Sequence, residues 1–223
     1  MSRFLTEYQL NFWERVLSPA FLDTIEMVAI TTLFGTIFGF LIAVILLVSN
    51  KDGIRPNKYI YGVVSFLVNV IRSFPFLILM ILLLPFTKLV AGTSIGVRAA
   101  VVPLIVSAAA FIAKLIENAM QEVDRGLIEA MKSFGISEAQ VVFRVMLTEA
   151  LPSIISGIIL AMVSILGCTA MAGAMGAGGI GSVAITYGYQ KFNYPVMGLT
   201  VAILIIFVEI IEAIGKWVYR KMK

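Results

Sequence analysis

The chain has 223 residues, of which 60% are hydrophobic and 13% charged, and its mean hydropathy is +1.01. These values exclude an ordinary soluble globular domain and indicate a protein that lies in a lipid bilayer. The net charge of +4 is what lysines and arginines at the cytoplasmic ends of membrane spans produce, so a nucleic-acid partner is not expected.

The amino-terminal segment 3–17 predicts a helix that lies in the membrane interface, because apolar residues recur at helical spacing with charged residues between them. The apolar positions are Phe4, Leu5, Tyr8, Phe12, Trp13 and Val16. The segment has no continuous apolar core, so a signal peptide is not indicated.

Five later segments reach the length of about 18 apolar residues that a membrane-spanning helix needs. They lie at roughly 26–48, 59–86, 99–117, 152–175 and 196–217. The predicted fold is therefore an all-α polytopic membrane protein with five transmembrane helices, in a single domain over 1–223. Residues 118–151, here called the polar loop, connect the third and fourth spans.

Basic residues predict the orientation of these spans. If the carboxy terminus is cytoplasmic, 12 of the 17 lysines and arginines lie on the inner side and five on the outer side. The outer ones are Arg3, Arg15, Lys88, Arg98 and Lys191. An odd number of spans then places the amino terminus outside and the polar loop in the cytoplasm.

Arg72 is the most unusual charge, because a single helix over 59–86 would hold it near the middle of the bilayer. Pro75 cannot donate a hydrogen bond to the Ile71 carbonyl, so it can bend this helix. Two interpretations stay open. Arg72 and Ser73 line a path through the membrane and meet an amino-acid carboxylate, or Arg72 reaches the interface or pairs with a carboxylate of the bundle.

The polar loop contains two short amphipathic helices joined at a glycine, with the sequence EAMKSFGISEAQVVFRVMLTEALP over 129–152. Gly135 suits the left-handed geometry that ends a helix, and Ser137 with Gln140 fits a capping box that begins the next. Pro152 is expected to end the second helix and to begin the fourth span. The pair either docks a separate motor protein or is an ordinary cytoplasmic hairpin.

The second of these helices has an apolar and a polar side. Its apolar side is Val141, Val142, Val145, Met146 and Ala150, and its polar side is Glu138, Arg144 and Thr148.

The fourth span is rich in small residues, and five of its glycines fall within 173–181. Small residues let helices approach closely in lipid, so packing is one interpretation. The other makes Met171 and Met175 adaptable plugs at the outer constriction of a pore. Cys168 is expected to be a packing residue. In the fifth span Glu212 can reach Lys216 one turn on, and Glu209 has no explanation.

Catalytic groups are scarce. The chain has no histidine and one cysteine, which excludes an internal disulfide and a Cys/His metal site. It also has no G-x-x-x-x-G-K-[ST] run, so it holds no phosphate-binding loop of its own. We do not expect an enzyme or a bound cofactor.

Glu129 and Ala130, a glycine six residues after the glutamate, and a hydrophobic stretch ending in Leu151 and Pro152 resemble the EAA loop of ABC importer permeases. Longer runs resemble the methionine-uptake permease family in particular, over roughly 60–195. They are NVIRSFPFLILMILLLPFTKLVAGTSIG (69–96), VVPLIVSAAAFIAKLIENAM (101–120), LTEALP (147–152), AMAGAMGAGGIG (170–181) and YGYQKFNY (187–194). Met131 and Thr148 depart from the family pattern.

The resemblance implies a permease subunit of the bacterial cell membrane that pairs with a copy of itself. It would contact two copies of a cytoplasmic ABC ATPase, which bind ATP and Mg, and would receive methionine from an extracytoplasmic binding protein. The polar loop would be its coupling loop. The implied coupling residues are Glu129, Ala130, Gly135, Ser137, Leu151 and Pro152.

Other functions stay open at this stage. The substrate can be L-methionine, D-methionine, another amino acid or a small peptide, and the sequence does not decide whether methionine regulates the ATPase. A motor-independent secondary transporter would carry paired ionisable residues near the midplane. Arg72 stands almost alone there, which argues against that class.

Overall fold

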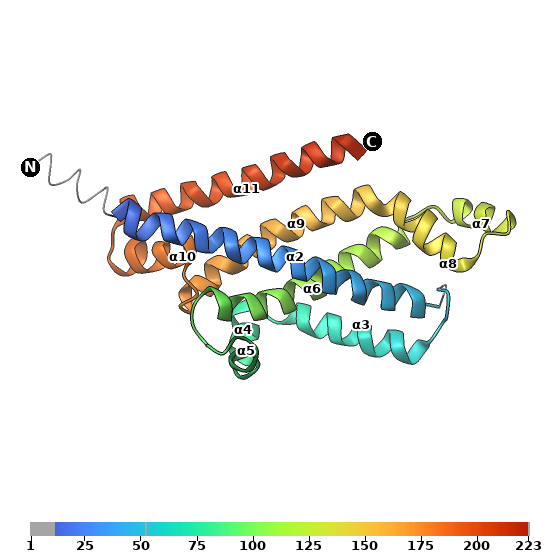
Figure 1. Ribbon diagram of the computed structural model, residues 1–223, viewed down its shortest axis with the longest axis horizontal. Coiled ribbons are helices and arrows are strands. Elements are labelled where there is room, and N and C mark those ends of the chain that lie inside the picture. The colour runs from blue at the N-terminus through green and yellow to red at the C-terminus, as the bar shows by residue number, and fades with distance from the viewer. Residues whose placement is uncertain (1–11, 52, 223) are drawn as a thin grey trace, which may run out of the picture. The chain divides into compact units, whose positions relative to one another are not determined.

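The computed structural model describes residues 12–51 and 53–222, and every regular element in these ranges is helical (Figure 1). In chain order, with η marking π-helical turns, the elements are η1 (Trp13–Leu17), α2 (Ser18–Ser49), α3 (Lys58–Ser73), α4 (Phe76–Leu82), α5 (Leu84–Ala91), α6 (Val97–Gln121), α7 (Arg125–Ser133), α8 (Glu138–Gln140), η2 (Val141–Met146), α9 (Leu147–Ala174), α10 (Gly179–Val183), η3 (Ala184–Gln190) and α11 (Tyr194–Met222).

Four helical stretches of the described residues are long and apolar enough to cross a membrane, and α3 with α4 supplies a fifth if the pair is one broken span. The four stretches are Trp13–Ser49, Val97–Gln121, Glu138–Ala174 and Tyr194–Lys221. The prediction of an all-α polytopic membrane protein is confirmed. Most predicted spans were too short at one or both ends.

The prediction of one helix over 59–86 is wrong. α3 ends at Ser73, because Phe74 and Pro75 are both extended, with ψ of 132°. A residue before proline is pushed out of the helical region, and the proline nitrogen has no hydrogen to donate to the Ile71 carbonyl. That carbonyl accepts from the amide of Phe74 instead, at 3.4 Å.

The predicted interfacial helix over 3–17 is not a separate element where it is described. Residues 1–11 lie outside the described residues, and from Trp13 the chain continues through η1 into α2. No glycine or extended residue separates the two stretches, so the helical bonding carries on into the first span.

Two compact units divide the chain, and their described residues fall in 12–32, 75–105 and 162–211 for the first and 33–74, 106–161 and 212–222 for the second. The first unit has a buried cluster that includes Met27, Met80, Leu104 and Ala172. A short turn joins α9 to α10, and Gly181 of α10 lies directly against Ala170 of α9.

In the second unit α2 passes close to α6. A Cβ added to Gly39 would lie 3.0 Å from Ile112, and Leu46, Ile112 and Ile116 are fully buried. This packing fixes the end of α6 from which the polar loop departs.

Candidate functional site

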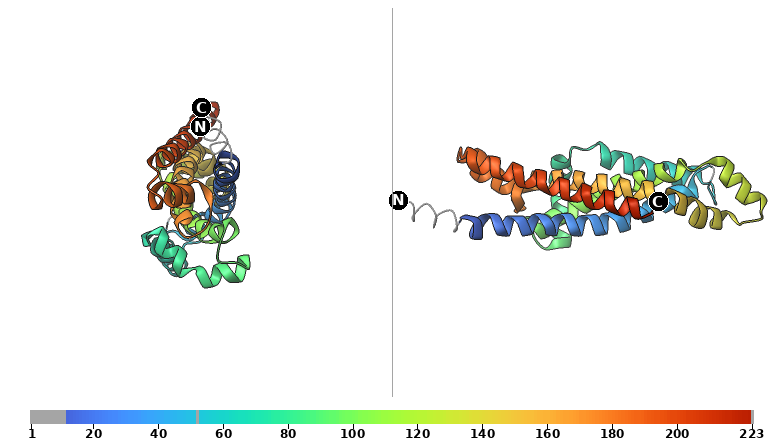
Figure 2. Two further views of the ribbon diagram at one scale, coloured as in Figure 1. Left: turned by 90° about the vertical axis from the view of Figure 1, so that its left-hand side faces the viewer. Right: turned by 90° about the horizontal axis from the view of Figure 1, so that it is seen from above.

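The polar loop begins with a capped helix. The Asp124 carboxylate accepts a hydrogen bond from the amide of Leu127 at 2.9 Å and so caps α7. None of the residues of α7 is fully buried, and the helix packs against η2 within the same unit. Figures 1 and 2 both show α7 and α8 at the end of this unit, beyond the last turn of α6. The helix is therefore held from one side and open on the other.

The turn between the two helices has the geometry that the sequence predicted. Gly135 has a φ of +79°, and its amide donates to the Lys132 carbonyl at 3.0 Å. The Ser137 hydroxyl accepts from the amide of Gln140 at 3.4 Å, while the Gln140 side chain accepts from the amide of Ser137 at 3.1 Å. The left-handed glycine and the capping box are both confirmed.

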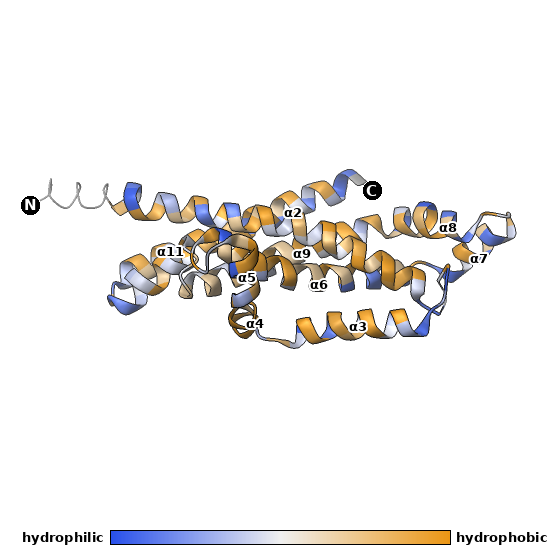
Figure 3. Cartoon of the chain, turned by 60° about the horizontal axis from the view of Figure 1, so that its bottom comes forward, coloured by the Kyte–Doolittle hydropathy of each residue, from blue (hydrophilic) through white to orange (hydrophobic). Residues whose placement is uncertain are grey.

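The second helix presents the two sides that the sequence predicted. Val141, Val142 and Ala150 are buried, whereas Glu138 and Arg144 are exposed. The apolar side anchors the polar loop to its own unit, and the polar side faces away. Figure 3 shows hydrophilic residues around α7, α8 and the turn between them, in contrast to the mostly hydrophobic α3.

Pro152 does not end this helix, contrary to the prediction. The helical stretch Glu138–Ala174 is continuous, and Pro152 lies inside α9. Proline removes one amide donor, but a break would free several backbone groups in an apolar environment, which costs more. The Pro152 carbonyl also accepts from the Ser156 hydroxyl at 3.0 Å. Leu151, beside it, is 38% exposed.

An exposed carboxylate and an exposed aromatic ring mark the open side of α7. Glu129 and Ala130 are exposed, and Phe134, at the end of the helix, is 79% exposed. Our sequence analysis did not single out Phe134, although a large apolar residue directly before a turn glycine in a polar loop is a usable signal. A partner surface that suits this side has a basic group beside an apolar pocket.

Arg72 and Ser73 are both exposed, at the end of α3. The Arg72 guanidinium lies 5.9 Å from the ring centre of Phe111 on α6, and the helix C-terminus also favours a cation. Ser73 donates to the Asn69 carbonyl at 2.8 Å. Among the described residues Arg72 has no ion pair, so the predicted pairing with a bundle carboxylate is not seen.

The two methionines proposed as plugs have different surroundings. Met171 is 50% exposed on α9, whereas Met175 packs against the buried cluster of the first unit. Cys168 packs against the same cluster, as predicted. In α11 the Lys216 ammonium lies 3.0 Å from Glu212, which confirms that pair, and Glu209 is exposed.

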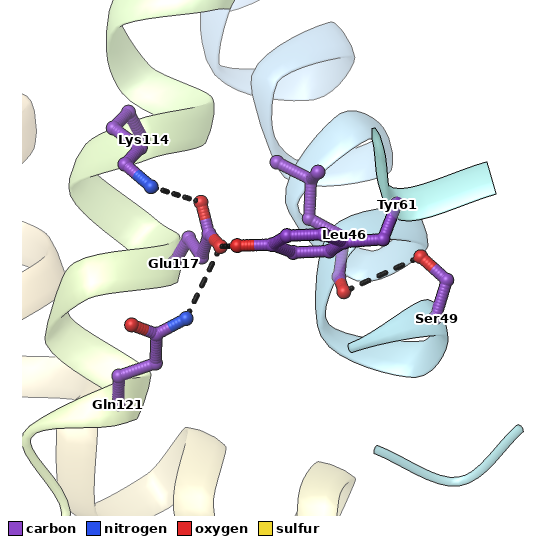
Figure 4. A network of polar contacts seen from close by, with 6 residues as sticks. All are labelled: Leu46, Ser49, Tyr61, Lys114, Glu117 and Gln121. Carbon is purple, nitrogen blue, oxygen red and sulfur yellow. Dashed lines mark hydrogen bonds and ion pairs between the residues drawn. The ribbon is translucent and has the colours of Figure 1, made fainter. Parts of the chain in front are cut away.

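A buried carboxylate in α6 was missed by the sequence analysis. Glu117 is 0% exposed and accepts three hydrogen bonds (Figure 4). Its donors are Lys114 at 2.8 Å and Gln121 at 3.1 Å, both on α6, and the Tyr61 hydroxyl at 3.0 Å, which comes from α3. A buried charge is tolerated when it is paired and hydrogen-bonded in this way.

The signal for this cluster was present in the sequence. Lys114, Glu117 and Gln121 recur every three or four residues at the end of an apolar span, and an ionisable residue in such a span is by default a functional candidate. Lys114 and Glu117 form a second ionisable group within a span, but they lie near the end of α6, so they do not test the prediction that Arg72 stands almost alone near the midplane.

Comparison with known proteins identifies the family to which this sequence is similar. The family model described as "Binding-protein-dependent transport system inner membrane component" matches residues 35–223. A "Probable D-methionine transport system permease protein MetI" of Vibrio cholerae is 42% identical over 200 residues, which cover 90% of this chain and 89% of that protein. A "Methionine import system permease protein MetP" of Bacillus subtilis is 43% identical over 171 residues, covering 77% of each chain.

A solved structure has the same fold. A chain of the "MetNI methionine ABC transporter" in an inward-facing conformation superposes with a TM-score of 0.90 at 38% identity, and the match covers 95% of this chain and 98% of that one.

Proposed function

Because the chain belongs to the methionine-uptake permease family of binding-protein-dependent transport systems, we propose that it is the permease subunit of an ATP-driven importer that carries methionine across the bacterial cell membrane. The subunit pairs with a second copy, contacts two copies of a cytoplasmic ABC ATPase and receives methionine from an extracytoplasmic binding protein. ATP and Mg bind the ATPase. This chain makes and breaks no covalent bond.

The polar loop carries this proposal. It offers an exposed carboxylate at Glu129 and an exposed ring at Phe134 on α7 and its C-cap, and α7 packs against η2, in which Val141 and Val142 are buried. A rigid, anchored helix with an open polar side can follow the movement of a docked motor. ATP binding closes the ATPase subunits, the polar loop moves with them, and the spans alternate between inward-open and outward-open states.

The same proposal fixes the orientation. The polar loop and the carboxy terminus face the cytoplasm, where ATP is available, and the amino terminus lies outside. Basic residues support this, because they concentrate on the predicted inner side.

A motor-independent transporter is the second candidate, and the pair of Lys114 with the buried Glu117 is the observation that favours it. The pair lies at the end of α6 that leads into the polar loop, and Tyr61 and Gln121 occupy the carboxylate. A coupling-ion site would need a carboxylate that is free to change partners.

One reconstitution separates the two candidates. The chain is co-purified with its ATPase, placed in liposomes, and given binding protein and radiolabelled L-methionine, D-methionine or other amino acids. We expect methionine uptake that needs both ATP and the binding protein. Uptake that persists without ATP and follows an imposed proton or sodium gradient would overturn the importer assignment. The panel of amino acids also decides the substrate range.

A further inference from the structure

α3 is attached to its own unit by few contacts. Of its 16 residues only Val68 is buried, and large apolar side chains such as Tyr59 and Phe66 are exposed. Among the described residues, the Tyr61 hydroxyl makes the one hydrogen bond that joins α3 to α6, to Glu117 at 3.0 Å (Figure 4). The Arg72 guanidinium over Phe111 adds a second contact between the same two helices.

Glu117 is held from two directions. Lys114 and Gln121 donate to it from its own helix, so these bonds stay intact in any rigid movement of α6. Tyr61 donates from α3, and only this bond changes if α3 and α6 move relative to one another. The carboxylate is fully buried, so loss of a donor is not compensated by water.

The position of Glu117 in the chain is the second part of the argument. It lies in the last turns of α6, and Gln121 is the final residue of that helix. Asp124, three residues later, caps α7, whose open side carries Glu129. A displacement of α7 is therefore delivered first to the end of α6 that holds Glu117.

We infer that Tyr61 and Glu117 form a joint that transmits movement of the polar loop from α6 to α3. Both are positioning residues, because neither docks the ATPase nor contacts the transported solute in this role. The inference rests on the proposed function, since it needs an ATPase that moves the polar loop. It adds a route by which that movement reaches a span with little packing of its own.

Two variants that each remove one hydrogen bond from the same carboxylate oxygen test the joint. Tyr61→Phe removes the bond between helices and keeps the ring, and Gln121→Met removes a bond within α6 and keeps the length of the side chain. Each variant is assembled with the ATPase and binding protein, and the amount of methionine imported per ATP hydrolysed is measured. Hydrogen exchange of the α3 amides is compared with and without bound ATP.

We expect Tyr61→Phe to lower import per ATP by about tenfold, the effect of losing one hydrogen bond to a charged group, and to abolish the ATP-dependent change in exchange of α3. Gln121→Met should stay within about twofold of the wild type in import per ATP. Glu117→Gln keeps one carbonyl oxygen as an acceptor for Tyr61, removes the charge and replaces the oxygen that accepts from Lys114 with an amide NH2 group. It should lose thermal stability yet keep most of its coupling.

Equal behaviour of Tyr61→Phe and Gln121→Met in both measurements would overturn the joint, because the cluster would then serve stability alone. Exchange of α3 does not depend on the solute. If the wild-type complex imports no methionine, the proposed substrate fails, and the ATP-dependent exchange of α3 still decides whether the joint exists.

Discussion

Two glycines of this chain have opposite surroundings. Gly135, in the polar loop, has a φ of +79°, and a Cβ added there would meet no atom within 4 Å. Gly181, in α10, is pressed against Ala170, and a Cβ added there would collide with the backbone of that residue. The first glycine is required by backbone conformation alone, and the second by the approach of two segments.

The surface at Gly135 is therefore free to contact a partner, whereas the space at Gly181 is already occupied by α9. The turn at Gly135 lies among mostly exposed residues and can dock another protein without disturbing a core. Gly181, within α10, belongs to the packing of its unit, so a change there acts on folding first. Substitutions in the two regions should therefore affect different measurements.

Gly181→Ala should give the largest loss of stability. The added methyl group must displace backbone, and overpacking of this kind lowers the free energy of unfolding by about 3 kcal/mol. Thermal unfolding in detergent measures the loss, and uptake should fall only in proportion to folded protein. Gly167→Ala is the matched control in α9, since a Cβ there meets nothing within 4 Å. If both variants unfold at the same temperature, the close approach of α9 and α10 is not a determinant of stability.

Met171, in α9, and Met175, in the turn after it, sharpen the same contrast. Met175→Ala should lower the free energy of unfolding by about 2 kcal/mol through a cavity beside the buried cluster, with uptake following folded protein.

Met171 is half exposed, so Met171→Ala should be milder in stability. If Met171 closes a pore between two copies of the chain, its alanine variant should hydrolyse ATP without control by the binding protein. Met171→Leu, which roughly conserves volume, should be mild in both measurements. A Met171→Ala complex that stays fully coupled would end the gate hypothesis.

Gly135→Val should cost less stability than either core change and more coupling. A β-branched residue at positive φ is strained by about 1–2 kcal/mol, and the strain stays within the exposed turn. Gly135→Asn is the control, because asparagine tolerates the left-handed region. Membrane insertion should survive in both variants, while stimulation of the ATPase by binding protein should fall only in the valine variant. Normal stimulation of Gly135→Val would mean that the geometry of this turn does not matter for coupling.

Local chemistry explains what the sequence could predict. Gly135, Ser137 and Gln140 act on their nearest neighbours, so the turn and the capping box were visible without a fold. The break before α4 was half visible, because Pro75 was identified but its effect on Phe74 was not included. Pro152 was expected to end a helix and does not, since proline ends helices far less reliably in apolar spans.

Contacts between distant segments could not be predicted in the same way. Tyr61 and Glu117 are 56 residues apart, and nothing local to either residue indicates the other. The exposure of Phe134 and the partial burial of Met175 likewise depend on which neighbours the fold brings together. The spacing of Lys114, Glu117 and Gln121 is visible in the sequence and predicts that the three side chains share one face of a helix. That Tyr61 contacts this face is known only from the structure.

Charge reversal at Glu129 tests most directly whether the polar loop docks the ATPase. Glu129→Lys changes an exposed residue, so the free energy of unfolding should change by less than about 0.5 kcal/mol. Glu14→Lys, at another exposed carboxylate on the predicted outer side, is the control. The measurement is ATP-driven methionine uptake in liposomes, with co-purification of the ATPase. We expect Glu129→Lys to abolish uptake and to weaken retention of the ATPase while Glu14→Lys matches the wild type. Wild-type uptake and ATPase retention in Glu129→Lys would contradict a docking role for this loop.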